Sequence, residues 1–127
     1  MADLSLNKSF TFYDEVEVPE TITQFISSNK KICFAVKILR DVVVFTDKRI
    51  LVVDKQGISG KKKEYYTIPF KNIVTYAIET AGKFDLDSEI KLVLSGGLCI
   101  ELNFIKDDDM DELLFKVYSL INKYIIG

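Results

Sequence analysis

The chain has 127 residues, the length of one ordinary domain, which argues against a two-lobed enzyme with a cleft between domains. Hydrophobic residues make up 48% and charged residues 28%, a globular balance that excludes disorder over most of the length. The net charge of −2 disfavours a dedicated nucleic-acid binder. The absence of histidine removes the commonest general base and the commonest metal ligand.

The start of the chain lacks the basic stretch and apolar run of a secretory signal. No uninterrupted apolar run approaches the roughly twenty residues that span a bilayer. We therefore expect a soluble, cytoplasmic protein. Cys33 and Cys99 each lie in an apolar, strand-like run, where a small side chain simply packs, and two isolated thiols cannot make a zinc site.

Up to about Lys31, acidic residues mix with scattered aromatic residues. Pro19 stands at a plausible first helical position, and Ile22, Phe25 and Ile26 follow at helical spacing, which predicts a short helix. We treat residues 1–30 as an acidic, helical extension and residues 31–127 as the main domain.

From Lys31 onward, short β-branched and aromatic runs alternate with turn residues at intervals of roughly ten, which predicts an antiparallel sheet or barrel. Gly96 and Gly97 are a two-residue hairpin signal between the last two strands. Seven strands are expected, over residues 32–39, 42–46, 50–54, 64–68, 73–80, 90–95 and 98–104.

Residues 107–109 are three aspartates, which suit the N-terminus of a helix. After them, the spacing of hydrophobic residues changes from a period of two residues to a period of 3.6 residues. One apolar stripe follows, formed by Met110, Leu113, Leu114, Val117, Leu120, Ile121, Tyr124 and Ile125. Burying such side chains at about 1.5 to 3 kcal/mol each is ample to dock a helix. We expect this C-terminal helix to plug the open end of a curled sheet or barrel.

Several runs of residues are similar to those of a known family. They are Val44 to Gly57, Gly60 to Lys62, Tyr65 to Pro69, Glu79 to Gly82 and Phe84 to Asp87. The chain resembles the bacterial pleckstrin-homology domain family over roughly residues 30–124. The resemblance implies a mainly β fold, a seven-stranded antiparallel PH-like (pleckstrin-homology-like) barrel capped by a C-terminal α-helix. It also implies a family without assigned enzymatic activity, whose members are similar to soluble proteins that can assemble into closed homo-oligomeric rings.

Candidate sites for chemistry are weak. Without histidine no catalytic triad can be written, and a pairing of Ser59 with the lysines at 61–63 would lie in a glycine-flanked loop that holds it poorly. Asp85, Asp87 and Glu89 are spaced to share one face of an extended segment and could hold a hard cation. They lack the glycine and distant glutamate of a calcium loop, so a solvated hairpin end is favoured. We expect no enzyme, no metal and no cofactor.

A basic hairpin is the first candidate binding surface. Lys55, Lys61, Lys62 and Lys63 bracket a turn with Ile58 at its tip, a pattern that suits contact with an anionic lipid surface. The alternative is a solvated loop that keeps strand edges from aggregating. The resemblance speaks against an inositol phosphate pocket, because the first strand reversal has only Arg40 and Asp41 where lipid-binding relatives have a long basic loop.

Large apolar residues outside the expected strands are the second candidate surface. Phe84 and Leu86 lie in a charged loop, and Phe10, Phe12 and Tyr13 lie beside acidic residues near the N-terminus. We expect a self-association interface there, against simple packing on the chain's own barrel. The leading hypothesis is a non-catalytic scaffold module that forms a homo-oligomeric ring and binds an unidentified protein partner. The alternative is peripheral binding to anionic membrane lipid through the basic hairpin.

Overall fold

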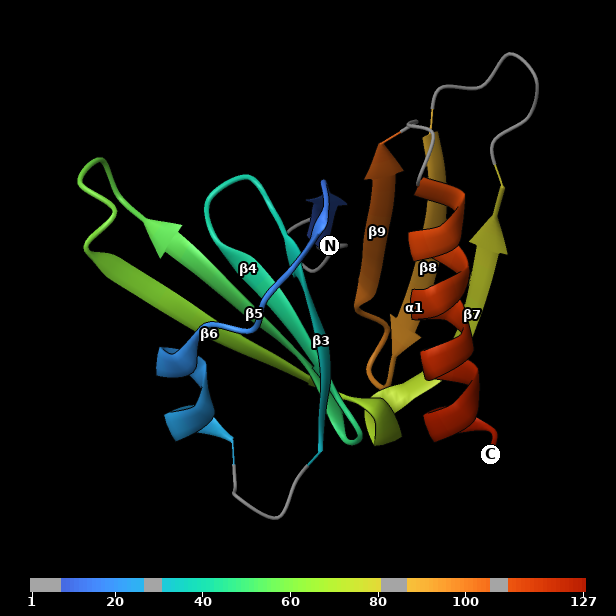
Figure 1. Ribbon diagram of the computed structural model, residues 1–127. Helices are drawn as coiled ribbons and strands as arrows, with labels where there is room; N and C mark the ends of the chain where they lie inside the picture. Colours follow the sequence, from blue (N-terminus) through green and yellow to red (C-terminus); the bar gives the residue numbers. More distant parts are fainter. Residues whose placement is uncertain (1–7, 27–30, 81–86, 106–109) are drawn as a thin grey trace.

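The computed structural model describes residues 8–26, 31–80, 87–105 and 110–127, which form two sheets and one C-terminal α-helix (Figure 1). The first sheet has the order β1-β9-β8-β7, and the second has the order β2-β3-β4-β5-β6. The strands are β1 (Lys8–Phe12), β2 (Glu15–Val16), β3 (Ile32–Lys37), β4 (Val42–Thr46), β5 (Arg49–Gln56), β6 (Lys62–Pro69), β7 (Ile73–Glu79), β8 (Asp87–Leu94) and β9 (Cys99–Ile105). The helices are the 3-10 helices η2 (Glu20–Phe25) and η3 (Phe70–Asn72) and the α-helix α1 (Met110–Ile125).

The mainly β fold with a C-terminal helix is as predicted, but the seven-stranded antiparallel barrel is not confirmed. The described part of the chain has nine strands, and no strand is shared between its two sheets. The two additional strands, β1 and β2, lie within residues 1–30. Moreover, β1 runs parallel to β9, with Lys8 opposite Ile100 and Phe12 opposite Phe104, whereas all strands were expected to be antiparallel. Local alternation cannot reveal this pairing because its partner lies near the other end of the chain.

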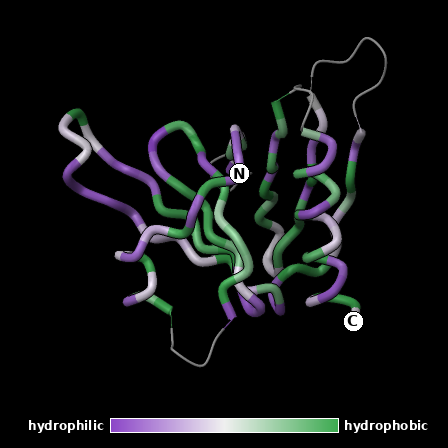
Figure 2. The backbone as a smooth tube through the Cα atoms, viewed as in Figure 1, coloured by the Kyte–Doolittle hydropathy of each residue, from purple (hydrophilic) through white to green (hydrophobic). Residues whose placement is uncertain are grey.

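The main core lies between the two sheets and α1. Phe12 is fully buried, with its ring edge-on to Phe45 at 6.0 Å and to Phe104 at 5.0 Å between centroids. From α1, the predicted stripe supplies fully buried Leu114, Val117 and Ile121. Figure 2 shows hydrophobic residues concentrated along the central strands, with hydrophilic residues along the arms of the projecting hairpins.

A second, smaller cluster covers the outer face of the second sheet. All five residues of β4 are buried, so this strand is packed on both faces. Ile22 and Ile26 from the η2 segment are 2% and 6% exposed and pack in the same cluster as Val44. The predicted N-terminal helix is therefore present as the 3-10 helix η2, with Pro19 as its N-cap rather than inside it. The N-terminal segment therefore adds β1 to the first sheet and β2 to the second, and it also covers the second sheet with η2. Among the described residues, no helix is long and apolar enough to cross a membrane.

Candidate functional site

Two turns of the second sheet come together at one end of the molecule. The β3–β4 turn and the β5–β6 turn project on the same side in Figure 1. Arg40 Nη2 donates a hydrogen bond to the carbonyl oxygen of Gly57 at 2.6 Å, and Lys63 Nζ lies 3.4 Å from Asp41 Oδ2. These two contacts hold the turns side by side.

Each turn carries one exposed apolar side chain. Leu39 is 76% exposed and Ile58 is fully exposed. The tip that presents Ile58 depends on Gly57 and Gly60, whose φ angles of 73° and 70° lie in the left-handed region that favours glycine. Large apolar side chains that protrude in this way from neighbouring turns are available to a partner.

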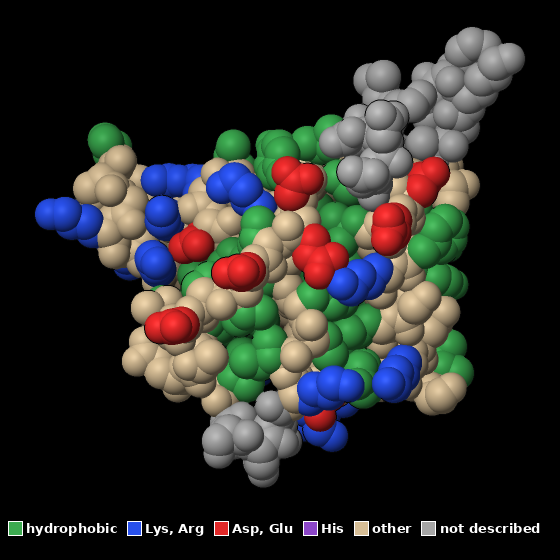
Figure 3. All heavy atoms as spheres, in the orientation of Figure 1, with side chains coloured by type: hydrophobic (Ala, Val, Ile, Leu, Met, Phe, Trp, Pro, Cys, Tyr) green, Lys and Arg blue, Asp and Glu red, His purple; other side chains and the backbone are tan. Residues whose placement is uncertain are grey.

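The same end is strongly basic. Lys55 lies opposite Lys63 across the β5–β6 ladder, and Gln56 lies opposite Lys62. Like charges directly opposite each other are unfavourable, and Asp41 offsets part of that repulsion through its ion pair with Lys63. Figure 3 shows Lys and Arg side chains gathered over this hairpin, with acidic side chains nearer the middle of the face. We call this the hairpin-tip surface, formed by Leu39, Arg40, Lys55, Ile58, Lys61, Lys62 and Lys63.

Five of these seven residues were singled out from the sequence, and the structure places them on one hairpin. Leu39 and Arg40 were missed as binding residues. The sequence placed Leu39 at the end of a predicted strand, but in the structure this strand ends at Lys37. The signal that could have found them is an apolar residue next to a cation in a tight reversal.

The residues proposed for self-association have different positions. Phe12 is fully buried in the chain's own core, so it has no surface to offer a second copy. Phe10 and Tyr13 are half-buried, and Phe10 packs against the same core. Phe84 and Leu86 lie outside the described residues.

Of the three carboxylates proposed to bind a cation, only Asp87 and Glu89 lie in the part of the chain that the structure describes. Asp85 lies outside the described residues, and Asp87 is the first residue of β8. Lys91 Nζ lies 3.3 Å from Glu89 Oε1 and 3.2 Å from Glu79 Oε1, so a lysine already occupies the space between these acids. Burial raises the pKa of Glu89, while the hydrogen bond with Glu89 lowers the pKa of Glu79. No group of three metal-ligating side chains occurs in the described part of the chain.

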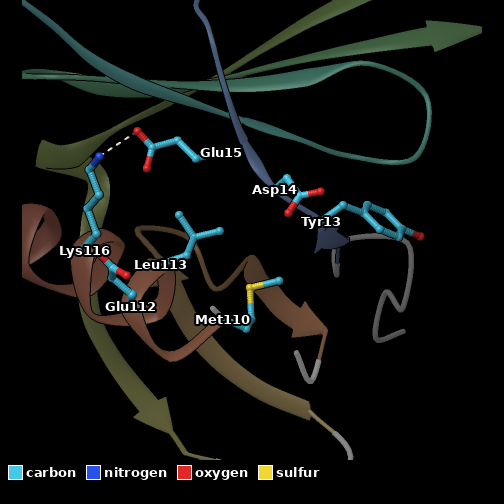
Figure 4. A pocket seen from close by; sticks show the side chains of 7 residues that line it. All are labelled: Tyr13, Asp14, Glu15, Met110, Glu112, Leu113 and Lys116. Atoms are coloured by element: carbon cyan, nitrogen blue, oxygen red, sulfur yellow. Dashed lines mark hydrogen bonds and ion pairs between the residues drawn. The ribbon is translucent and has the colours of Figure 1, made fainter. Parts of the chain in front are cut away.

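A pocket of about 390 Å³ lies where β1 and β2 meet the start of α1 (Figure 4). Met110 and Leu113 line it from the helix, and Asp14 and Glu15 line it from the N-terminal segment. Lys116 Nζ lies 2.7 Å from Glu15 Oε2 and 4.6 Å from the centroid of the Phe34 ring. These contacts fasten α1 to the second sheet, which is a structural role.

Burial raises the pKa of the Cys33 thiol, which keeps it protonated rather than a reactive thiolate. Lys31, Lys123 and a hydrogen bond with Tyr124 favour the thiolate form of Cys33, but burial outweighs them. Ser59 Oγ accepts a hydrogen bond from the Lys61 backbone N–H at 3.3 Å, a contact that shapes the turn.

Comparison with known proteins places this geometry in context. A profile of the bacterial PH (pleckstrin-homology) domain matches residues 4–125. The uncharacterized protein YjqA of Bacillus subtilis (strain 168) is 44% identical over 98 residues, which cover 76% of this chain and 78% of that protein. The uncharacterized protein YozO of the same organism is 38% identical over 89 residues, covering 70% and 73% of the two chains.

Solved structures agree with the sequence relatives. A protein with a pleckstrin-homology domain from Shewanella loihica PV-4 superposes with a TM-score of 0.71 at 33% identity, covering 88% of this chain and 96% of that one. A pleckstrin-homology domain from Shewanella amazonensis SB2B gives a TM-score of 0.62 at 35% identity, covering 88% and 93%. Both the sequence match and the fold therefore lead to one assignment: the chain belongs to the bacterial pleckstrin-homology domain family.

Proposed function

We propose that this chain is a non-catalytic, cytoplasmic interaction module that binds anionic lipid membranes through its hairpin-tip surface. The observation that carries the proposal is the pair of exposed apolar tips, Leu39 and Ile58, on turns joined by the Arg40–Gly57 hydrogen bond. Protruding apolar side chains ringed by cations match the two layers of a membrane surface, in which acyl chains lie beneath anionic headgroups.

The expected affinity follows from these groups. Arg40, Lys55, Lys61 and Lys62 contribute about 1 kcal/mol each near anionic lipid, or about 4 kcal/mol together, which is millimolar binding. Burying Leu39 and Ile58 adds at most about 1.5 to 3 kcal/mol each, and partial insertion adds less. A single copy therefore binds weakly, and several copies linked in one assembly bind much more tightly.

Vesicle sedimentation tests the proposal. We expect the chain to sediment with phosphatidylserine-containing vesicles but not with pure phosphatidylcholine, and added salt to release it. The double variant Lys61→Glu, Lys62→Glu loses this binding. A matched control, Lys48→Glu with Lys71→Glu, makes the same change in net charge at the other end of the molecule. This control variant keeps its vesicle binding. Equal binding by both variants would contradict the proposal.

A second candidate function is self-assembly into a homo-oligomeric ring that scaffolds a protein partner. The observation that favours it is an edge of the first sheet: among the strands that the structure describes, β7 pairs with β8 alone, and Val74 on it is 65% exposed. An open edge offers backbone N–H and C=O groups to another chain.

Light scattering tests the assembly. An oligomer that Val74→Lys converts to a monomer supports pairing through β7, because a charged edge residue opposes strand addition. Ile126→Lys, at a residue that is 74% exposed and lies outside β7, just after the end of α1, is the control and should leave the assembly intact. A monomer at tens of micromolar, whatever the variant, excludes the ring.

A further inference from the structure

A second cavity lies at the end of the molecule away from the hairpin-tip surface. Its volume is about 740 Å³. The β4–β5 turn, the end of β6, η3 and the last turn of α1 line it, and Figure 1 shows these segments meeting at the end opposite the two projecting turns. The cavity is large enough for one large side chain with its neighbouring backbone.

Part of the cavity wall is apolar and is formed by two packed aromatic rings. The rings of Phe70 and Tyr124 are parallel, with 5° between their planes and 6.1 Å between centroids. Phe70 is 4% exposed, and its backbone N–H donates to the Lys48 carbonyl oxygen at 2.9 Å, which joins η3 to the β4–β5 turn. Pro69, Ile73 and Ile125 complete the apolar part of the lining.

The rim of the cavity is basic. Lys48, Arg49 and Lys71 line it, against a single acid, Asp47. Arg49 is held in place by hydrogen bonds from its guanidinium to the Phe25 carbonyl oxygen at 3.0 Å and to Thr67 Oγ1 at 3.4 Å.

The two lysines of the rim remain available. Lys48 and Lys71 are exposed and form no ion pair with any residue that the structure describes. The neighbouring pocket, which shares Tyr124, adds Lys31 and Lys123 to the same end of the molecule.

We infer that this cavity binds an acidic peptide segment of a protein partner, with one large apolar side chain against Phe70 and Tyr124 and carboxylates beside Lys48 and Lys71. The concave shape favours a peptide over a membrane, because a flat bilayer reaches protruding tips but not the floor of a cavity. The inference rests on the proposed role as an interaction module and supplies the chemistry of its protein partner. The module then has two binding surfaces at opposite ends, one for anionic lipid and one for an acidic peptide.

Fluorescence anisotropy with a labelled short peptide tests the inference, the peptide having one central phenylalanine flanked by glutamates. We expect the Lys48→Glu, Lys71→Glu variant to weaken binding about tenfold or more, because two attractive contacts become repulsive. The Lys61→Glu, Lys62→Glu variant, with the same net charge, binds like the wild type. A peptide of glutamates alone binds about tenfold more weakly, since it lacks the apolar contact.

Three results would overturn the inference: no binding of the phenylalanine peptide, equal weakening by both double variants, or equal affinity for the glutamate-only peptide. Vesicle sedimentation of the same two variants separates this outcome from failure of the proposed membrane binding. In that assay we expect the Lys61→Glu, Lys62→Glu variant to lose binding and the Lys48→Glu, Lys71→Glu variant to keep it. Loss of vesicle binding in the Lys48→Glu, Lys71→Glu variant, without peptide binding, would assign this end of the molecule to the membrane instead.

Discussion

Arg40 reaches from the β3–β4 turn to the carbonyl oxygen of Gly57 in the β5–β6 turn, at 2.6 Å. The contact joins two hairpins whose tips carry the exposed Leu39 and Ile58. A charged donor to a backbone carbonyl is stronger than a neutral hydrogen bond, so Arg40 both adds charge to the surface and sets the spacing of its two apolar tips.

This double role distinguishes Arg40 from the lysines around it. We expect Arg40→Ala to reduce vesicle binding more than Lys55→Ala, although each removes one charge, because only Arg40→Ala also removes one of the two contacts that hold the turns together. Titration with phosphatidylserine-containing vesicles measures the difference. Equal losses in the two variants would show that the Arg40–Gly57 contact has no part in binding.

Phe12 is the residue through which the N-terminal segment enters the core. We expect Phe12→Ala to lower the free energy of unfolding by about 3 to 5 kcal/mol, since it leaves a cavity between Phe45 and Phe104. Phe115→Ala is the control, because Phe115 is 51% exposed and its loss changes the stability by about 0.5 kcal/mol or less. Urea unfolding followed by circular dichroism measures both, and similar values for the two variants would contradict the burial of Phe12.

Stability should fall at alkaline pH. Burial raises the pKa of Cys33 and the pKa of Tyr76 above their ordinary values. A raised pKa means that the folded state holds its proton more tightly, so the contribution is complete below the unfolded pKa and is lost as pH rises through the folded pKa.

Matched variants test this pH dependence. The free energy of unfolding is expected to decline from about pH 8.5 upward for the thiol and from about pH 10 for the phenol. Cys33→Ala makes the first part of the decline shallower, and Tyr76→Phe makes the second part shallower. Tyr76→Phe also loses the hydrogen bond to Asn122, about 0.5 to 1.5 kcal/mol at neutral pH. Parallel pH profiles of the wild type and both variants would be the contrary result.

Strands β3 to β9 and α1 were predictable because their signals are local. Alternating hydrophobicity, the Gly96-Gly97 turn and the 3.6-residue stripe of α1 each act within a short window of the chain. Two strands were not predictable: β2 has only two residues, and β1 gains its stability from pairing with β9 at the far end of the chain. The same non-local packing decided that Phe12 is a core residue.

The binding surfaces were predictable only in part. The lysines around Ile58 are close together in sequence, so their clustering could be seen there. The contribution of Arg40 required the two turns to be adjacent in space. The basic cavity was not foreseen at all, because it combines the β4–β5 turn, η3 and the last turn of α1, which lie far apart in the sequence.

An environment-sensitive dye at position 58 tests the membrane proposal most directly. The dye is attached to Ile58→Cys in a background with Cys33→Ser and Cys99→Ser, and to Ser95→Cys, an exposed turn at the opposite end, as the control. We predict that phosphatidylserine-containing vesicles shift the emission of the dye at position 58 to shorter wavelength and leave the dye at position 95 unchanged. No shift at position 58, or an equal shift at both positions, would contradict membrane binding through the hairpin-tip surface.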